Sequence, residues 1–365
     1  MSIQTSRIFD TLCGITTAFL SDTLCPTITQ MSDSNSSLSR ARRGTVNETI
    51  PTATFRKPHR KRLTALISLG LFIVSAVALW SHYWFARPVG SGPAGPTVPR
   101  DAFQTAWSTR KVVLLGLGDS VTQGLGASTG GQSYFQRLAR NPANEFPDMQ
   151  GISLSHVLPK LETLNLAISG TTSIECVDYQ LPKLKPYDDE TFGIVVMTTG
   201  GNDVIHNYGR TPPREGAMYG AKIDEITEWT RNFETRLETI ADRVRTTFPG
   251  GCHIFVANIY DPTDGDGDIV YAGLPAWSDG VKVLQAYNDV LSRFAERHAD
   301  VTLIDMHGLF LGHGIHCTQF WHHAYRANDP HYWYWDNLED PNDRGYDALR
   351  RLFLIEMSKV LPGKL

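Results

Sequence analysis

Cysteine is scarce in this chain. Five occur in 365 residues, and only Cys176, Cys252 and Cys317 follow residue 85. Three is an odd number, so at most one internal disulfide can form among them, and their spacing does not say which two would pair. The sequence therefore excludes a small scaffold that is held together by disulfides.

Positive charge is also scarce in the larger part of the chain. Residues 1–62 contain nine Lys/Arg and four Asp/Glu, whereas residues 63–365 contain 25 Lys/Arg and 34 Asp/Glu. A folded region with such an acidic balance repels nucleic acid. We therefore expect no nucleic-acid partner.

Lys, Arg, Asp and Glu are absent altogether from residues 63–85, LTALISLGLFIVSAVALWSHYWF. A helix of this length, at about 1.5 Å per residue, crosses the hydrocarbon core of a bilayer. A cleaved secretion signal would need a shorter basic region, a shorter apolar core and a small-residue cleavage site, and a buried core helix would carry a polar face. The sequence predicts a single transmembrane helix over residues 63–85, acting as an uncleaved signal anchor.

The flanks of this segment predict its orientation. Five basic residues come just before it: Arg56, Lys57, Arg60, Lys61 and Arg62. Three aromatic residues gather at its far end, as in an interfacial belt: Trp80, Tyr83 and Trp84. Because positive flanks stay inside, we expect the N-terminus in the cytoplasm and the C-terminal part in the periplasm or outside the cell.

Composition divides the remaining chain. Residues 1–62, rich in Ser and Thr, predict a disordered basic cytoplasmic tail, with Met31 as an alternative start. Residues 86–101 predict a Pro/Gly linker that keeps the next domain clear of the membrane. The folded domain is predicted over residues 102–365.

Within that domain, short apolar runs alternate with amphipathic stretches. Strands are predicted at 111–118, 162–167, 192–200, 252–260 and 301–307, each apolar enough to be covered on both faces. Helices are predicted near 222–247 and 281–298, and a last helix carries apolar residues at spacings of three and four. This alternation predicts a three-layer α/β domain with a five-stranded parallel sheet, whose ligands bind at the carboxyl ends of the strands.

Three of the predicted strands end in small, polar turns. "GLGDSVTQG" places Ser120 at one strand end, "NLAISG" places Gly170 at the next, and "GGND" places Asn202 at the third. Asp119 is suited to hold the first turn through backbone amides. Each turn alone has an ordinary structural role, but an ester hydrolase needs donors converging on an oxyanion. The amides of Ser120, Gly170 and Asn202 could supply them.

Together, "GDSVTQG", "NLAISG" and "GGND" resemble the first three sequence blocks of the GDSL-type esterases and lipases, the SGNH hydrolases. The resemblance covers roughly residues 111–361. It implies a flavodoxin-like α/β/α fold, Ser120 as the nucleophile, Gly170 and Asn202 in the oxyanion hole, and ester hydrolysis without a metal or other cofactor.

The fourth block departs from the pattern. The family has Asp, two residues, His, Pro and Asn, whereas residues 337–342 read "NLEDPN", with Asp340 in place of the histidine. We expect Asp340 to cap the last helix, with Pro341 at its first position. An exposed carboxylate with a pKa near 4 would be a poor base at neutral pH.

The missing base is predicted from the histidines upstream. His331 is the nearest in sequence to Asp340, and Asp329 is placed to orient its ring. We therefore predict His331 as the general base and Asp329 as its partner. His206, four residues after Asn202, is the second candidate if the turn there continues as a helix.

Two other features of the segment between the fifth predicted strand and the last helix leave alternatives open. His313, His316 and Cys317 are zinc-ligand types, but their spacing matches no familiar tetrahedral site, and we expect no metal. The aromatic residues of 320–335 are suited to wall an acyl pocket, to stack on a sugar or to hold the loop onto the domain.

The sequence thus predicts a membrane-anchored serine ester hydrolase that acts through an acyl-enzyme. Its substrate would be a small or polymer-borne ester, such as a lipid, an acetylated carbohydrate or a simple carboxylic ester. The alternative is a non-catalytic binding module of the same fold that recognises an acylated or glycosylated ligand.

Overall fold

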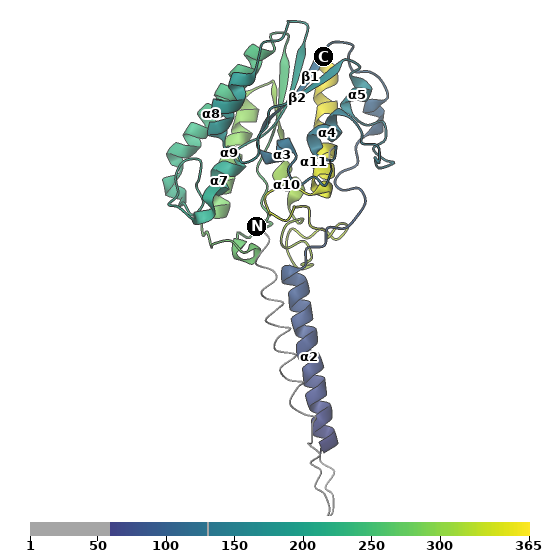
Figure 1. Cartoon of the computed structure of the whole chain (residues 1–365), viewed down its shortest axis with the longest axis vertical. Coiled ribbons are helices and arrows are strands. Elements are labelled where there is room, and N and C mark those ends of the chain that lie inside the picture. The colour runs from purple at the N-terminus through teal and green to yellow at the C-terminus, as the bar shows by residue number, and fades with distance from the viewer. Residues whose placement is uncertain (1–58, 130) are drawn as a thin grey trace, which may run out of the picture. The chain divides into compact units, whose positions relative to one another are not determined.

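The computed structural model describes residues 59–129 and 131–365 (Figure 1). The predicted tail up to residue 58, including two residues of the basic flank, lies outside the described residues. The first described element is the helix α2, His59–Phe85. From Arg60 onward it is long and apolar enough to cross a membrane, and within the described chain only its last turn, with Tyr83 and Trp84 half-buried, packs on the domain.

A single parallel sheet forms the centre of the domain. Its strands are β1 Val112–Gly118, β2 Leu161–Asn165, β3 Phe192–Thr198, β4 Cys252–Ala257 and β5 Val301–Ile304. They are ordered β2-β1-β3-β4-β5, and every neighbouring pair is parallel. This is the flavodoxin-like order, so the predicted fold is confirmed.

The five strands differ in how far they are covered. β1 and β3 lie inside the sheet and are buried at every position. β2 lies at the edge and is partly exposed along its whole length, so the prediction that all five strands are covered on both faces is wrong there. Three of its five residues, Glu162, Thr163 and Asn165, are polar, and exposed Glu162 pairs with Lys111 at 3.1 Å.

Helices cover both faces of the sheet (Figure 1). One face carries α4 Tyr134–Ala139, α5 Leu154–Val157 and α11 Asp343–Val360, and the other carries α8 Thr227–Thr247 and α9 Gly280–Arg297. Successive residues of β3 enter opposite cores: Ile194 and Val196 pack on the α11 side, Val195 and Met197 on the α8 side. This two-residue period is the expected one for a covered strand.

Short helical elements complete the described chain. The short α-helices are α3 Ser120–Gln123, α6 Ser173–Glu175, α7 Gly201–Ile205 and α10 Met306–Phe310. The 3-10 turns are η1 Arg100–Phe103, η3 Leu181–Lys183, η4 His206–Gly209, η5 Ile223–Glu225, η6 Ile269–Ala272 and η7 Leu361–Gly363, and η2 Cys176–Gln180 is a π turn. The described cysteines, Cys176, Cys252 and Cys317, are all free.

The segment between α2 and the domain is held against α11. Arg344 Nη1 donates to the carbonyls of residues 91–93 at 2.6, 3.0 and 3.4 Å, and the backbone N–H of Ala94 donates to Asp347 Oδ2 at 3.0 Å. Gly95 has a φ of +85°, and a Cβ there would come within 2.6 Å of the α11 backbone. The Pro/Gly composition of residues 86–101 did not predict these contacts.

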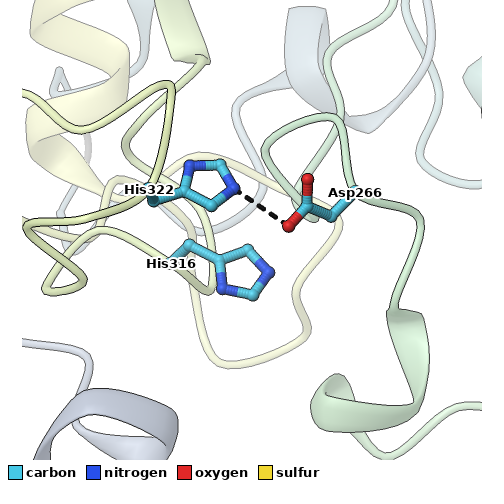
Figure 2. Close-up of side chains that lie close together, drawn as sticks. All are labelled: Asp266, His316 and His322. Atoms are coloured by element: carbon cyan, nitrogen blue, oxygen red, sulfur yellow. Dashed lines mark ion pairs between the residues drawn. The ribbon is translucent and has the colours of Figure 1, made fainter.

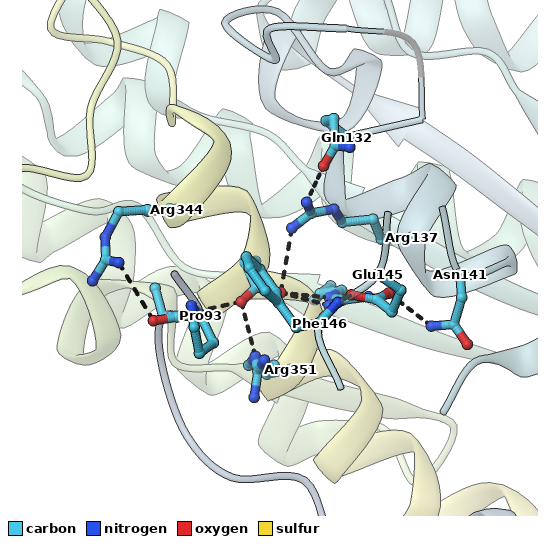
Figure 3. A network of polar contacts seen from close by, with 12 residues as sticks. Pro93, Gln132, Arg137, Asn141, Glu145, Phe146, Arg344 and Arg351 are labelled. Atoms are coloured by element: carbon cyan, nitrogen blue, oxygen red, sulfur yellow. Dashed lines mark hydrogen bonds and ion pairs between the residues drawn. The ribbon is translucent and has the colours of Figure 1, made fainter. Parts of the chain in front are cut away.

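A cluster of buried charges joins α4, α11 and the segment around residue 145 (Figure 3). Arg350 is fully buried and donates to Glu145 through both terminal nitrogens, at 2.5 and 2.7 Å, and to Asp347 at 2.8 Å. Arg351 donates to Asp347 at 3.0 Å, and Arg137 lies 3.3 Å from the same carboxylate. We call this the Arg350 cluster. In it, every buried carboxylate has a cationic partner.

Candidate active site

Ser120 lies where β1 turns into α3. Gly118 has a φ of +107°, and a Cβ there would overlap the carbonyl of Thr198 on β3, so only glycine allows this turn. Asp119 is the N-cap of α3 and accepts from the backbone N–H of Val121 at 3.1 Å. Ser120 is the first helical residue. The predicted place of the serine and the predicted tie by Asp119 are both present.

Burial changes the acidity of Asp119. Its side chain is 5% exposed, and its Oδ1 accepts from the Thr198 hydroxyl at 2.6 Å. Burial raises the pKa of Asp119 to about 7, against the opposing effect of the hydrogen bond from Thr198. The nearby charge of Asp340 raises the pKa further. Asp119 is therefore a carboxyl group that titrates near neutrality.

Of the two other predicted oxyanion residues, Asn202 lines the Ser120 cavity and Gly170 is not among its lining residues. Asn202 is the second residue of α7, and it lines the same cavity as Ser120. Its Nδ2 donates to the carbonyl of Thr171 at 3.0 Å, which joins it to the turn at Gly170. An amide NH₂ has two hydrogens, so this bond leaves the second for a ligand. Gly170 has a φ of +80°, with open space where a Cβ would be.

The cavity at Ser120 has a volume of about 140 Å³. Ser120, Asn202 and Glu339 are among its polar lining residues. Its apolar walls include Val204, Ile205, Ile259, Leu274, Trp277 and Leu284. Most of these come from the region between β4 and the first turns of α9, which no motif had marked. A polar end and an apolar wall are what an ester with a hydrophobic acyl group requires.

The aromatic loop at 320–335 has a different role from that wall. Trp333 and Tyr334 are almost fully buried, and the Trp333 ring stacks on His313 at 3.4 Å. Neither residue lines the Ser120 cavity. These aromatic side chains attach the loop to the domain, whereas Phe320 and Trp321 remain exposed. Of the alternatives left open by the sequence, attachment of the loop fits the buried rings.

The fourth block differs from its prediction. Asn342, not Asp340, is the N-cap of α11, and it accepts from the backbone N–H groups of Arg344 and Gly345 at 3.0 and 3.1 Å. Asp340 is 1% exposed, so the expectation of an exposed carboxylate is also wrong. The reason is that the block folds back on itself, with Trp335 N–H bonded to the Asp340 carbonyl at 2.7 Å.

Asp340 lies close to Ser120. Its carboxylate interacts with the Ser120 hydroxyl, and its Oδ2 also accepts from Asn337 Nδ2 at 2.6 Å. Burial raises the pKa of Asp340 above its ordinary value, while these two contacts act in the opposite direction. Burial likewise raises the pKa of the adjacent Glu339 to about 7. The site thus holds three carboxyl groups whose pKa values are raised.

His331 has the acidic partner that was predicted for it. Its Nδ1 lies 2.5 Å from Asp329 Oδ1, and Asp329 is held by Arg344 Nη2 at 2.6 and 2.7 Å. The other side of the ring faces Gly90, where a Cβ would come within 2.8 Å of Nε2. No contact among the described residues joins His331 to Ser120. Its role as the base therefore stays a prediction.

His206 does not meet the condition set for it. The helix α7 ends at Ile205, and His206 is its C-cap with a ψ of 144°, so the turn after Asn202 does not continue as a helix. His206 is half-buried and is not among the residues that line the cavity. What places Asp340 at the serine is the fold of the fourth block, for which the local sequence gave no direct signal.

One group of side chains has the composition of a metal site (Figure 2). Asp266, His316 and His322 bring ligand-type atoms within 4.8 Å of one another. His322 Nδ1 accepts from the backbone N–H of Ala324 at 3.2 Å, and its Nε2 lies 3.1 Å from Asp266 Oδ2. His316 Nε2 lies 2.9 Å from Asp268 Oδ1. The contacts of this group in the described chain are histidine–carboxylate pairs.

Comparisons with known proteins identify a family. Residues 117–348 match the GDSL-like lipase/acylhydrolase family. Solved structures with a similar fold include a lipase from a goat rumen metagenome, at 17% identity and a TM-score of 0.42, covering 67% of this chain and 96% of that one. A phospholipase A1 from Streptomyces albidoflavus is 19% identical, with a TM-score of 0.42 and coverages of 69% and 100%.

An acetylxylan esterase from Geobacillus stearothermophilus is also similar, at 18% identity and a TM-score of 0.39, covering 68% of this chain and 94% of that one. No curated protein matches the chain. The family match spans more than half of the sequence, from the end of β1 into α11, and includes Ser120, Gly170 and Asn202. The chain belongs to the GDSL-like lipase/acylhydrolase family.

Proposed function

We propose that this protein is a membrane-anchored serine ester hydrolase. The observation that carries the proposal is the shared cavity of Ser120 and Asn202, where a hydroxyl and an amide donor meet at the carboxyl ends of β1 and β3. Ser120 attacks the ester carbonyl and forms an acyl-enzyme, which water then hydrolyses. The backbone amides of Ser120 and Gly170 and the side-chain amide of Asn202 stabilise the oxyanion.

The apolar wall of the cavity supports a carboxylic ester as the substrate, with its acyl group packed against Ile259, Leu274 and Trp277. Such esters occur in lipids, in acetylated carbohydrates and as simple small molecules. The predicted pair of His331 and Asp329 is one candidate for the base.

The anchor and its orientation belong to the same proposal. The apolar stretch of α2 is exposed in the described chain up to His82, which suits a segment surrounded by lipid. Arg60, Lys61 and Arg62 begin the helix, and Trp84 lies near its other end. By the positive-inside rule, the N-terminus is cytoplasmic and the catalytic domain is periplasmic or extracellular.

One labelling experiment tests the chemistry and the topology together. Intact cells that express the full chain are treated with a charged, membrane-impermeant fluorophosphonate or with a permeant one, and the labelled site is identified by peptide mass spectrometry. We expect both probes to label Ser120 and neither to label Ser120→Ala.

Each contrary result has a separate meaning. Labelling by the permeant probe alone would reverse the proposed orientation. If neither probe labels the folded protein, the alternative holds, namely a non-catalytic module that binds an acylated or glycosylated ligand.

A further inference from the structure

We propose that Asp340 is the general base for Ser120, with Asn337 as the residue that positions it. This rests on the proposed ester hydrolysis. In the family pattern, Asp340 occupies the histidine position and Asn337 the aspartate position three residues earlier. The chain would then keep the geometry of the fourth block while changing the chemical group that accepts the proton.

The contacts of Asp340 support this role. Of its two carboxylate oxygens, Oδ2 is bound by Asn337 Nδ2 at 2.6 Å. Oδ1 is buried and has no well-formed hydrogen bond among the described residues. The Ser120 hydroxyl also interacts with this carboxylate. A buried acceptor oxygen without a hydrogen bond of its own is what a general base needs before the substrate binds.

Asn337 restricts how Asp340 can move. While its Nδ2 holds the carboxylate, its Oδ1 accepts from the backbone N–H groups of Glu339 and Asp340, both at 3.1 Å. The block is also held by the bridge between Tyr334 and Pro341. Asn337 thus binds one oxygen of the base and holds it in place, as the third member of a triad does.

The surroundings of Asp340 adjust its basicity. The titratable groups that face it in the described chain are Asp119, Glu339, Tyr260 and Tyr346, and none of them is a cation. Burial without a cationic partner raises the pKa of the Asp340 carboxyl, against the hydrogen bonds that lower it. A base accepts a proton most effectively when its pKa approaches the working pH, so this environment removes the objection to an aspartate.

The proton balance is complete with these groups alone. As Ser120 Oγ bonds to the carbonyl carbon, its proton passes to Asp340 and the carbonyl π electrons move to the oxygen. When the carbonyl re-forms, the carbon–oxygen bond to the leaving alcohol breaks, and that alkoxide takes the proton from Asp340. In the second half, Asp340 removes a proton from the attacking water and returns it to Ser120 Oγ as the acyl bond breaks.

The test compares three single substitutions in the full-length protein. Asp340→Asn keeps the shape but lacks the base, and we expect kcat/KM for a p-nitrophenyl ester to fall about 10²- to 10⁴-fold. The exposed neighbour Asp336→Asn is the matched control and should stay within about twofold of the wild type. The loss in Asp340→Asn should exceed that in His331→Ala by about tenfold or more.

The pH dependence separates catalysis from structure. In the wild type, kcat/KM should fall as the pH drops through the raised pKa of Asp340, because the base must be unprotonated. This limb should lie above the ordinary aspartate range and should vanish in Asp340→Asn. Asp340→His should retain turnover with a limb near the ordinary histidine pKa of about 6.5. If Asp340→Asn does not fold, as judged by thermal melting, this limb and the histidine variant still decide the matter.

The failures are distinguishable. If Asp340→Asn turns over like the wild type while Ser120→Ala is inactive, the protein is an ester hydrolase and Asp340 is not its base. If the wild type neither reacts with fluorophosphonate nor hydrolyses esters, the proposed function fails as well. If an inactive wild type becomes active as Asp340→His, the base has been lost and the inference is overturned.

Discussion

Two of the groups of carboxylates that the described domain buries are treated in opposite ways. In the Arg350 cluster, burial acts to raise the pKa of Glu145, but the hydrogen bonds and charge of Arg350 hold it below its ordinary value. Beside Ser120, burial raises the pKa of Asp119 and of Glu339, each to about 7. In the part of the chain that the structure describes, the second group, which includes Asp340, has no arginine among the contacts of its carboxylates.

The difference teaches where to look for chemistry in this fold. A buried carboxylate with a bidentate arginine is a structural connector, because its charge is neutralised on the spot. A buried carboxylate without a cation destabilises the fold, so it persists where the shifted pKa is of use. The Arg350 cluster joins α4 to α11, and the unpaired group surrounds the serine.

Breaking the Arg350 cluster should have the largest effect on stability. Arg350→Leu leaves Glu145 and Asp347 buried with less compensation, and we expect the free energy of unfolding to fall by about 3–5 kcal/mol. Urea denaturation at neutral pH measures this. Lys359→Leu, on the same helix and in an exposed pair with Glu356, is the matched control and should change stability by about 0.5 kcal/mol or less. Equal effects of the two substitutions would contradict the comparison.

Replacing Asp119, a buried carboxylate without a cationic partner, should have a smaller effect, and it should raise the free energy of unfolding. The pKa of Asp119 is raised to about 7, so its stabilising effect is complete below the unfolded value near 3.8 and is lost as the pH rises through about 7. Asp119→Asn keeps an oxygen acceptor and does not ionise. Relative to the wild type, it should gain roughly 2–4 kcal/mol in unfolding free energy between pH 4 and pH 8. Parallel pH profiles of the two proteins would contradict this assignment.

The smallest effect comes from the hydrogen bond that partly offsets the burial of Asp119. Thr198→Val removes the hydroxyl that donates to Asp119 Oδ1 at 2.6 Å. The pKa of Asp119 should then rise further, and the variant should lose about 1 kcal/mol more at pH 8 than at pH 4. An NMR titration of the Asp119 carboxyl carbon measures the shift directly. An unchanged or lower pKa would show that the hydroxyl does not stabilise the ionised form.

Sequence reasoning reached the fold and three of the four blocks, because each depends on local patterns. β1 and β3 are continuous apolar runs, and Ser120, Gly170 and Asn202 directly follow predicted strands, so a parallel sheet brings them to one edge. β2 was the exception. Its sheet position, and therefore its exposure, is decided by strand order, which the composition of LETLN does not specify.

The fourth block could not be read in the same way. "DPND" contains several good capping residues, and local rules do not say which one the helix uses. The choice of Asn342 depends on its reach to the carbonyls of Tyr332 and Tyr334, at 2.9 and 3.1 Å, which belong to the preceding loop. Once Asn342 is the cap, Asp340 is free to face Ser120. The burial of Asp340 is therefore a tertiary result.

The segment after α2 determines how far the cavity at Ser120 can move from the proposed membrane anchor. If residues 86–101 were an unattached flexible chain, their ends would lie about 22 Å apart on average. The domain could then move over a similar distance relative to the anchor. Instead, Arg344 grips residues 91–93, and Gln319 Nε2 donates to the Tyr83 carbonyl at 3.0 Å. The chain between α2 and the domain is thus held to the domain at both of these points. With α2 in a membrane, as proposed, esters at that surface are the ones within reach, and a soluble ester must diffuse to it.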